Sequence, residues 1–365
     1  MLRKFSISGF RGFNKKIVFD LTKAHDYEFN SHLIHNGIIS SGVIYGKNGS
    51  GKSSLGFALF DIVGMLTDFQ LAEPMRENST YINAETTRKS ADFEYEFLFG
   101  SDIVCYSYKK TAPDTIISET LAVNNNVMVE RTNDNVSFKG NHSLIIPVLP
   151  ANMSALRYIY RNTPLDENNA VKCVVSFAEK MLWFRSLNSR GYCGYTSGSS
   201  KLTDELSKSN KLKEFEAFLK DTAGIRINLE LNESVTGSKE LYIKYPHRLV
   251  NFFKASSTGT QELLLVFYWT SLALDNIKFL FIDEFDAFYH FELAASIVRS
   301  ISRRPYLQSF FTSHNTYMAS NELMRPDCFF IISNGKITSF ADSTNRELRE
   351  GHNLEKLLRN GEFGV

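Results

Sequence analysis

The stretch that decides the fold is VIYGKNGSGKSSL, residues 43–55. Within it, residues 46–53 fit the pattern G-x-x-x-x-G-K-[ST] in full, with an apolar strand at 42–45 and a helical pattern at 53–66 on either side. The backbone N–H groups of such a loop wrap a phosphate, and the helix N-terminus adds its dipole. We expect Lys52 to reach the terminal phosphates of a nucleotide and the Ser53 hydroxyl to ligate Mg²⁺.

An apolar run ends in two carboxylates at FLFIDE, residues 279–284. Open α/β sheets place their ligands at the carboxyl ends of the strands, where this pair falls. We expect Asp283 to hold Mg²⁺ through water and Glu284 to polarise an attacking water. An ordinary strand end is the alternative for the pair alone, but its place after a complete phosphate-binding loop favours the catalytic interpretation.

A third stretch, SSTGTQE at 256–262, opens an apolar helix. Thr258 and Gln261 resemble a capping box, and a helix N-terminus of small residues can bind an anion. An ordinary capped helix is the alternative. Spacing matters here, because Asp283 lies 231 residues after Lys52 and only 26 after Ser257. The first separation is far longer than is usual in AAA+ motors.

The fourth stretch is FFTSH, residues 310–314, an apolar strand ending in a histidine 30 residues beyond Glu284. A lone histidine at a strand end is usually structural. In this order of motifs, His314 suits a hydrogen bond to the γ-phosphate of the nucleotide.

These four stretches, with the opening FSISGFRGF at 5–13, resemble the RecF/SMC-type ABC ATPases. Within that group they look most like the OLD-like and AbiLii/RloA-like ATPases of phage defence and abortive infection. The resemblance covers about 1–110 and 240–365. It implies a P-loop NTPase fold of the ABC-ATPase type, ATP and Mg²⁺ as cofactors, and a homodimer or higher oligomer closed by ATP.

The resemblance also implies roles for individual residues. Asp283 with Ser53 would serve the metal, and Glu284, His314 and Lys52 would be catalytic. Asp286 would start the D-loop, and His290 matches a histidine of OLD-like members with no assigned role. The nucleotide would contact Gly46, Asn48, Gly49, Ser50, Gly51, Lys52, Ser53, Ser54, the signature residues Ser257 and Gly259 of the opposite subunit, and Arg11 of the F-R motif. A structural turn is the alternative for Arg11.

Three features depart from the family pattern. Thr258 stands where transporters and SMC proteins carry glycine. Gln70 follows Lys52 too closely to be a convincing Q-loop residue. The stretch after His314 is too short for a TOPRIM nuclease domain, so we expect a separate effector protein, either a nuclease or a toxin.

Pattern and composition divide the chain into three parts. Residues 1–148 hold the P-loop and an antiparallel β subdomain, with strands in 5–20, 93–99 and 103–110. Residues 149–225 read as an inserted helical lobe with a Gly/Ser-rich loop at 188–200. Residues 226–365, which begin with two strand-like runs, return to a mixed or parallel sheet core.

Composition is that of an ordinary globular protein of 365 residues, with 43% hydrophobic residues and a net charge of +1. No apolar stretch is long enough to span a bilayer, and there is no signal peptide, so we expect a cytoplasmic protein without a membrane partner. The four cysteines form no C-x-x-C pair, which disfavours a zinc or redox site.

Two functions remain open. The first is an ATP-driven switch that dimerises around ATP, hydrolyses it, and regulates the separate effector in phage defence. The second is a RecF-like DNA-binding repair clamp. For the clamp, the sequence offers a moderately basic stretch, for which a solvated helix face is an equal explanation: Arg157, Arg161, Lys172, Lys180, Arg185 and Arg190. A transporter subunit is disfavoured by the signature position and the FRGF opening.

Overall fold

The computed structural model describes residues 1–69, 77–139, 146–185, 191–194, 206, 211–233, 239–268, 271, 276–287 and 290–364. Gln70 and most of the 188–200 loop, including Arg190, lie outside these residues. The chain divides into two compact units. Unit 1 comprises 1–197, 277–285 and 302–365, and unit 2 comprises 198–276 and 286–301.

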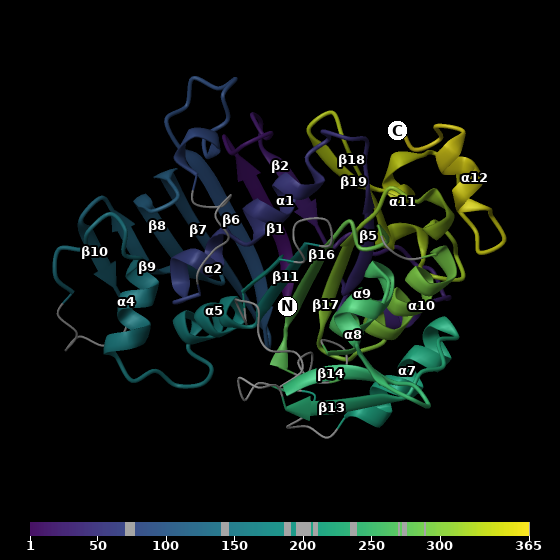
Figure 1. The fold of residues 1–365 in the computed structure, drawn as a ribbon. Helices are drawn as coiled ribbons and strands as arrows, with labels where there is room; N and C mark the ends of the chain where they lie inside the picture. The colour runs from purple at the N-terminus through teal and green to yellow at the C-terminus, as the bar shows by residue number, and fades with distance from the viewer. Residues whose placement is uncertain are drawn as a thin grey trace. The chain divides into compact units, whose positions relative to one another are not determined.

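The core sheet of unit 1 has the order β12-β11-β16-β17-β5-β18-β19 (Figure 1). Its five central strands are parallel, and the two edge strands are antiparallel. Every residue of β5, β16 and β17 is buried, as a sheet covered on both faces requires. The strands are β5 (Ser41–Tyr45), β11 (Met181–Arg185), β12 (Gly191–Gly194), β16 (Phe279–Asp283), β17 (Gln308–Thr312), β18 (Phe329–Ser333) and β19 (Lys336–Ser339).

A second, antiparallel sheet of unit 1 has the order β10-β9-β8-β7-β6-β1-β2. The hairpins expected around 5–20 and 93–110 form within it, and three more strands extend it. Buried and less buried residues alternate along β6, so one face packs and the other meets solvent. The strands are β1 (Leu2–Ser8), β2 (Ile17–Asp20), β6 (Ala91–Phe99), β7 (Asp102–Ala112), β8 (Thr115–Val123), β9 (Asn126–Thr132) and β10 (Asn135–Phe138).

The helix that follows the P-loop touches both sheets. The expected helix is broken at Phe60 into α1 (Lys52–Leu59) and α2 (Asp61–Leu66). A Cβ at Gly56 would lie 2.8 Å from Trp183 of β11 and 3.0 Å from Phe281 of β16, so α1 meets the core sheet at a residue without a side chain. On the other side, the Tyr95 hydroxyl of β6 donates to the Ala58 carbonyl at 2.9 Å.

Part of the segment expected to be an inserted helical lobe belongs to the core sheet. Helices α4 (Ala155–Asn162) and α5 (Ala170–Glu179) form as expected. The next residues, 181–185, are strand β11, which pairs in parallel with β16. A short apolar run fits a buried strand and a buried helix equally well, which is why periodicity alone failed here.

Unit 2 has its own small sheet, β13-β14-β15. The expectation that the runs after residue 226 return to the core sheet is therefore wrong, because these strands pair only with one another among the described residues. In its core the Phe215 ring packs against those of Phe252 and Phe267. The elements are α7 (Leu212–Ala223), β13 (Leu229–Glu233), β14 (Lys239–Lys244), β15 (Leu249–Asn251), α8 (Phe252–Ala255), α9 (Thr258–Tyr268) and α10 (Phe291–Ser302).

Short elements complete unit 1. Its two-residue strands and short helices are η1 (Ser31–Leu33), β3 (Ile34–His35), β4 (Ile38–Ile39), η2 (Asn78–Thr80), η5 (Thr316–Met318), η6 (Pro326–Cys328), α11 (Phe340–Ser343) and α12 (Leu354–Arg359). Across the described part of the chain, no helix has both the length and the apolar character that crossing a bilayer requires.

A buried ion pair joins α2 to the antiparallel sheet. Lys110 Nζ lies 2.9 Å from Asp61 Oδ2, and both side chains are almost fully buried. The hydroxyls of Tyr81 and Tyr108 donate to the same carboxylate at 2.9 and 3.1 Å. Burial, with the Asp61 charge next, raises the pKa of both tyrosines well above the usual value, so they remain neutral donors. The carboxylate thus receives three hydrogen-bond donors.

We predict that Asp61→Ala lowers the free energy of unfolding by about 3–5 kcal/mol, because it leaves the Lys110 ammonium buried without its counter-ion. Chemical denaturation measures the change. Glu347→Ala, which removes a carboxylate from an exposed pair with Arg349, is the matched control and should change stability little. Equal effects of the two substitutions would contradict this account of the buried pair.

Candidate functional site

The loop between β5 and α1 is shaped by its glycines. A Cβ at Gly46 would lie 2.4 Å from Ser50 Oγ and 2.8 Å from the Ile332 carbonyl, so no other residue fits there. Gly49 and Gly51 have φ values of 78° and 107°, which L side chains rarely adopt. The backbone therefore follows a tight path that the sequence pattern specifies.

Lys52 lies across this loop. Its ammonium group donates to the carbonyls of Gly46 at 2.7 Å and Lys47 at 3.3 Å. Burial lowers the pKa of Lys52, while the carboxylates of Asp283 and Glu284 act in the opposite direction. The charges of both carboxylates therefore favour the protonated, positively charged form of Lys52.

The acidic strand end is organised by Thr312, the last residue of β17. The Thr312 hydroxyl donates to Asp283 Oδ1 at 2.6 Å and accepts from the Glu284 backbone N–H at 2.8 Å. Asp283 and Thr312 are both buried. The neighbouring strand therefore fixes the carboxylate of Asp283 and the backbone of the residue after it.

Glu284 has a strained backbone. Its φ is 51°, in the left-handed region that residues other than glycine and asparagine seldom adopt. Its Oε1 lies 3.8 Å from His314 Nε2, and both side chains are partly exposed. The turn after β16 thus sets the Glu284 carboxylate beside His314, which follows β17. Both residues lie at the carboxyl ends of the parallel strands, where the P-loop also follows β5.

The FRGF turn packs against the P-loop helix. The Phe13 ring lies 2.7 Å from the place where Gly51 would carry a Cβ, and a Cβ at Gly12 would lie 3.8 Å from Ser54 Oγ. Arg11 has φ 45°, and its guanidinium lies 4.0 Å from the centroid of the Phe57 ring of α1. The structure thus brings the Arg11 side chain to α1, the helix that follows the P-loop.

Ser257 and Gly259, the residues expected to form the signature, lie in unit 2, at the start of α9. The capping expectation was off by one residue, because the cap is Ser257, whose hydroxyl accepts from the Thr260 N–H at 3.3 Å. The Gln261 amide donates instead to the carbonyls of Phe253 and Ser256 at 2.8 and 3.0 Å. Ser257 is exposed. Asp286 and His290 also lie in unit 2.

Sequence reasoning missed Thr312 and the location of Arg185. Thr312 stands two residues before His314, but nothing in the sequence indicates that its hydroxyl faces Asp283. Arg185 was counted only in a basic stretch. In the parallel register of β11 and β16 it lies opposite Asp283. Only the assignment of 181–185 as a core strand reveals this position.

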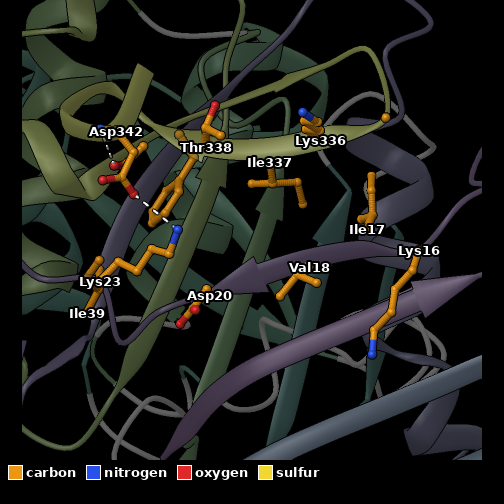
Figure 2. Close-up of a pocket in the computed structure, with 13 residues that line it drawn as sticks. Lys16, Ile17, Val18, Asp20, Lys23, Ile39, Lys336, Ile337, Thr338 and Asp342 are labelled. Carbon is orange, nitrogen blue, oxygen red and sulfur yellow. Dashed lines mark hydrogen bonds and ion pairs between the residues drawn. The ribbon is translucent and has the colours of Figure 1, made fainter. Parts of the chain in front are cut away.

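A cavity of about 230 Å³ lies elsewhere on unit 1, between the edge strands β2 and β19 (Figure 2). Val18 and Ile337 line its middle, with Lys16 and Lys336 toward one end and Asp342 and Lys23 toward the other. No residue of the P-loop or of the acidic strand end lines it. It is therefore separate from the candidate site.

Comparisons with known proteins bear on the fold. The family described as "AAA domain, putative AbiEii toxin, Type IV TA system" matches residues 151–320, which include the signature, the acidic pair and His314 but not the P-loop. The chain is similar to an SMC head bound to the C-winged helix domain of ScpA, with 17% identity, a TM-score of 0.50, and coverage of 93% of this chain and 97% of that one. That similarity confirms the expected ABC-ATPase type of fold.

Two further SMC head structures match less well. The SMC head domain from Thermotoga maritima has 15% identity and a TM-score of 0.45, covering 93% of this chain and 97% of that one. An SMC head with an extended coiled coil, bound to the C-terminal domain of ScpA derived from Pyrococcus furiosus, has 17% identity, a TM-score of 0.46 and 98% coverage of each chain. No curated protein gives a significant match.

We predict that Thr312→Val lowers the free energy of unfolding by about 1–3 kcal/mol, since the buried Asp283 carboxylate and the part-buried Glu284 N–H both lose their hydrogen bond to the Thr312 hydroxyl. Thermal or chemical unfolding without nucleotide measures the loss. Thr312→Ser keeps the hydroxyl and should lose less. If the serine variant is as unstable as the valine variant, packing of the methyl group matters and the hydrogen bonds do not.

Proposed function

We propose that this chain, which has the ABC-ATPase fold of SMC heads, binds Mg²⁺–ATP and hydrolyses it. The observation that carries the proposal is that the P-loop, the acidic pair and His314 all lie at the carboxyl ends of neighbouring parallel strands, β5, β16 and β17, within one compact unit. The spacing of the motifs along the chain would not by itself place them together.

The residues present fit a nucleotide with its metal. The helix N-terminus at Gly51 and the loop N–H groups are suited to phosphates, and Lys52 would exchange the loop carbonyls for phosphate oxygens. Magnesium bound to a nucleotide uses one or two protein ligands together with water and phosphate oxygens. Ser53 and Asp283 would supply the protein contacts. Among the described residues no cluster of three His, Cys, Asp or Glu side chains forms a metal site of its own.

Glu284 and His314 would act on the reaction itself. Glu284 would accept a hydrogen bond from the attacking water and align it with the γ-phosphate, and His314 would donate to the γ-phosphate. Their separation of 3.8 Å leaves them without a tight mutual hydrogen bond, so both side chains remain available to water and phosphate. The left-handed backbone of Glu284 supports the same assignment, because such strain clusters at functional sites.

The proposed cycle includes a dimer. The exposed Ser257 and the N-terminus of α9, with Gly259, would contact the γ-phosphate held by a second copy, and hydrolysis would release the pair. This trans contact is consistent with the exposure of the cap hydroxyl, and Thr258 in place of a glycine is expected to modulate it.

For the biological role, we propose regulation of a separate effector, a nuclease or a toxin, in cytoplasmic phage defence. The motif resemblance to abortive-infection ATPases supports this, as does the match of 151–320 to a family named for a toxin–antitoxin system. The SMC head in one similar structure is bound to a domain of ScpA, a separate protein, which is compatible with a partner here.

A RecF-like DNA clamp is the second candidate. Its basic stretch is partly neutralised within the molecule, because Arg157 and Arg161 both pair with Asp68, and Lys172 pairs with Glu167 at 2.6 Å. This favours the switch. ATP-dependent DNA binding that weakens steeply with salt would reverse the preference.

We predict that Lys52→Ala abolishes detectable ATP binding, and that Glu284→Gln binds ATP but slows hydrolysis by at least about 100-fold, because the group that aligns water is lost. Isothermal titration and phosphate release measure the two properties. Lys109→Ala, which changes an exposed lysine of β7 outside the phosphate-binding loop, is the control. A Glu284→Gln variant with full activity would contradict the assigned role.

We predict that Glu284→Gln protein dimerises with Mg²⁺–ATP and that adding Ser257→Arg prevents this, because a bulky side chain would block the trans contact. Light scattering after size exclusion, with and without ATP, measures the mass. The double variant should still bind ATP. A monomer at saturating ATP, or a dimer insensitive to Ser257→Arg, would refute the proposed closure.

A further inference from the structure

Two arginines from distant parts of the chain share one aromatic ring. The guanidinium of Arg11 lies 4.0 Å from the centroid of the Phe57 ring, and that of Arg185 lies 5.1 Å from it. The Arg185 guanidinium also lies 5.2 Å from the Trp183 ring. All three distances are within the range of cation–π contacts, so the two rings hold both charged groups at α1.

Each arginine reaches this place from an element of the candidate site. Arg11 belongs to the turn that packs on Gly51 and Ser54, at the start of α1. Its backbone N–H donates to the Tyr81 carbonyl at 3.1 Å, and its carbonyl accepts from the Asn83 amide. Arg185 ends β11 opposite Asp283, so their backbones are about 5 Å apart across neighbouring strands.

The two like charges oppose each other. Burial is the largest cause that lowers the pKa of Arg11, and Arg185 lowers it further, while Glu77 raises it. A phosphate group that accepts hydrogen bonds from both guanidinium groups would reduce their mutual repulsion. Planar guanidinium groups are well suited to phosphate oxygens.

We propose that Arg185 is a second phosphate-binding arginine of the nucleotide site, and that it acts together with Arg11, beside Phe57, on the phosphates of the nucleotide that the P-loop holds. The proposal rests on the proposed function. Both guanidinium groups lie at Phe57 of α1; the turn that carries Arg11 packs on the start of that helix, and Arg185 ends the strand beside Asp283. Phe57 and Trp183 position the Arg185 side chain before the nucleotide arrives, so little side-chain freedom is lost on binding.

The test measures the affinity of Arg185→Gln for Mg²⁺–ATP and for inorganic pyrophosphate by titration calorimetry. Glutamine keeps much of the side-chain length but not the charge, and circular dichroism and thermal unfolding verify that the variant folds. We expect about 10- to 100-fold weaker binding of both ligands, as for the loss of a charged hydrogen bond. Arg185→Lys, which keeps the positive charge, should recover part of the lost affinity. The control is Arg161→Ala, an exposed arginine of α4, which should bind as the wild type does.

A double-mutant cycle tests the partnership. If Arg11 and Arg185 act on the same phosphates, the effects of Arg11→Ala and Arg185→Gln on affinity will not add. If the wild-type chain binds ATP and Arg185→Gln binds it with the same affinity, the proposal is overturned, even if the variant is less stable. A wild-type chain that binds no ATP overturns the proposed function, and this proposal with it.

Discussion

The close fit of α1 between two sheets is the constraint on which the rest of unit 1 depends. At Gly56 the helix has no side chain, so its backbone can approach Trp183 and Phe281 of the core sheet. On the opposite side the Tyr95 hydroxyl reaches the helix carbonyl of Ala58. A helix held on both sides has little freedom to rotate, so the loop that precedes it and the ring of Phe57 have set positions.

Local motifs were readable from the sequence because their chemistry is local. The glycines of the P-loop are required by backbone geometry within a few residues, and the alternation in 93–110 reports directly on a half-exposed sheet. The FRGF turn was also recognised. The sequence did not show that Phe13 packs on Gly51, since that contact depends on the path of the chain between them.

What the sequence missed depends on pairing between distant segments. The run at 181–185 is too short for its periodicity to distinguish a strand from a helix, so its place beside β16 and the position of Arg185 were not predictable. The Thr312 hydroxyl acquires its role only because β17 lies next to β16. The cap at Ser257 was misplaced by one residue because a serine and a threonine stand side by side, and both are good caps.

The strand order has a consequence for how the chain is made. β5, formed early in the sequence, lies between β17 and β18, and Leu2 of β1 exchanges hydrogen bonds with the side chain of Gln308, 306 positions later. During synthesis the P-loop strand therefore emerges long before either of its neighbours. Until β17 and β18 have been synthesised, the apolar strand β5 has neither of its neighbours to pair with, and such a state is prone to aggregation. We infer that completing this sheet is a late, slow event of biogenesis, so a chain truncated before β17 would have no stable core in which to hold its phosphate-binding loop.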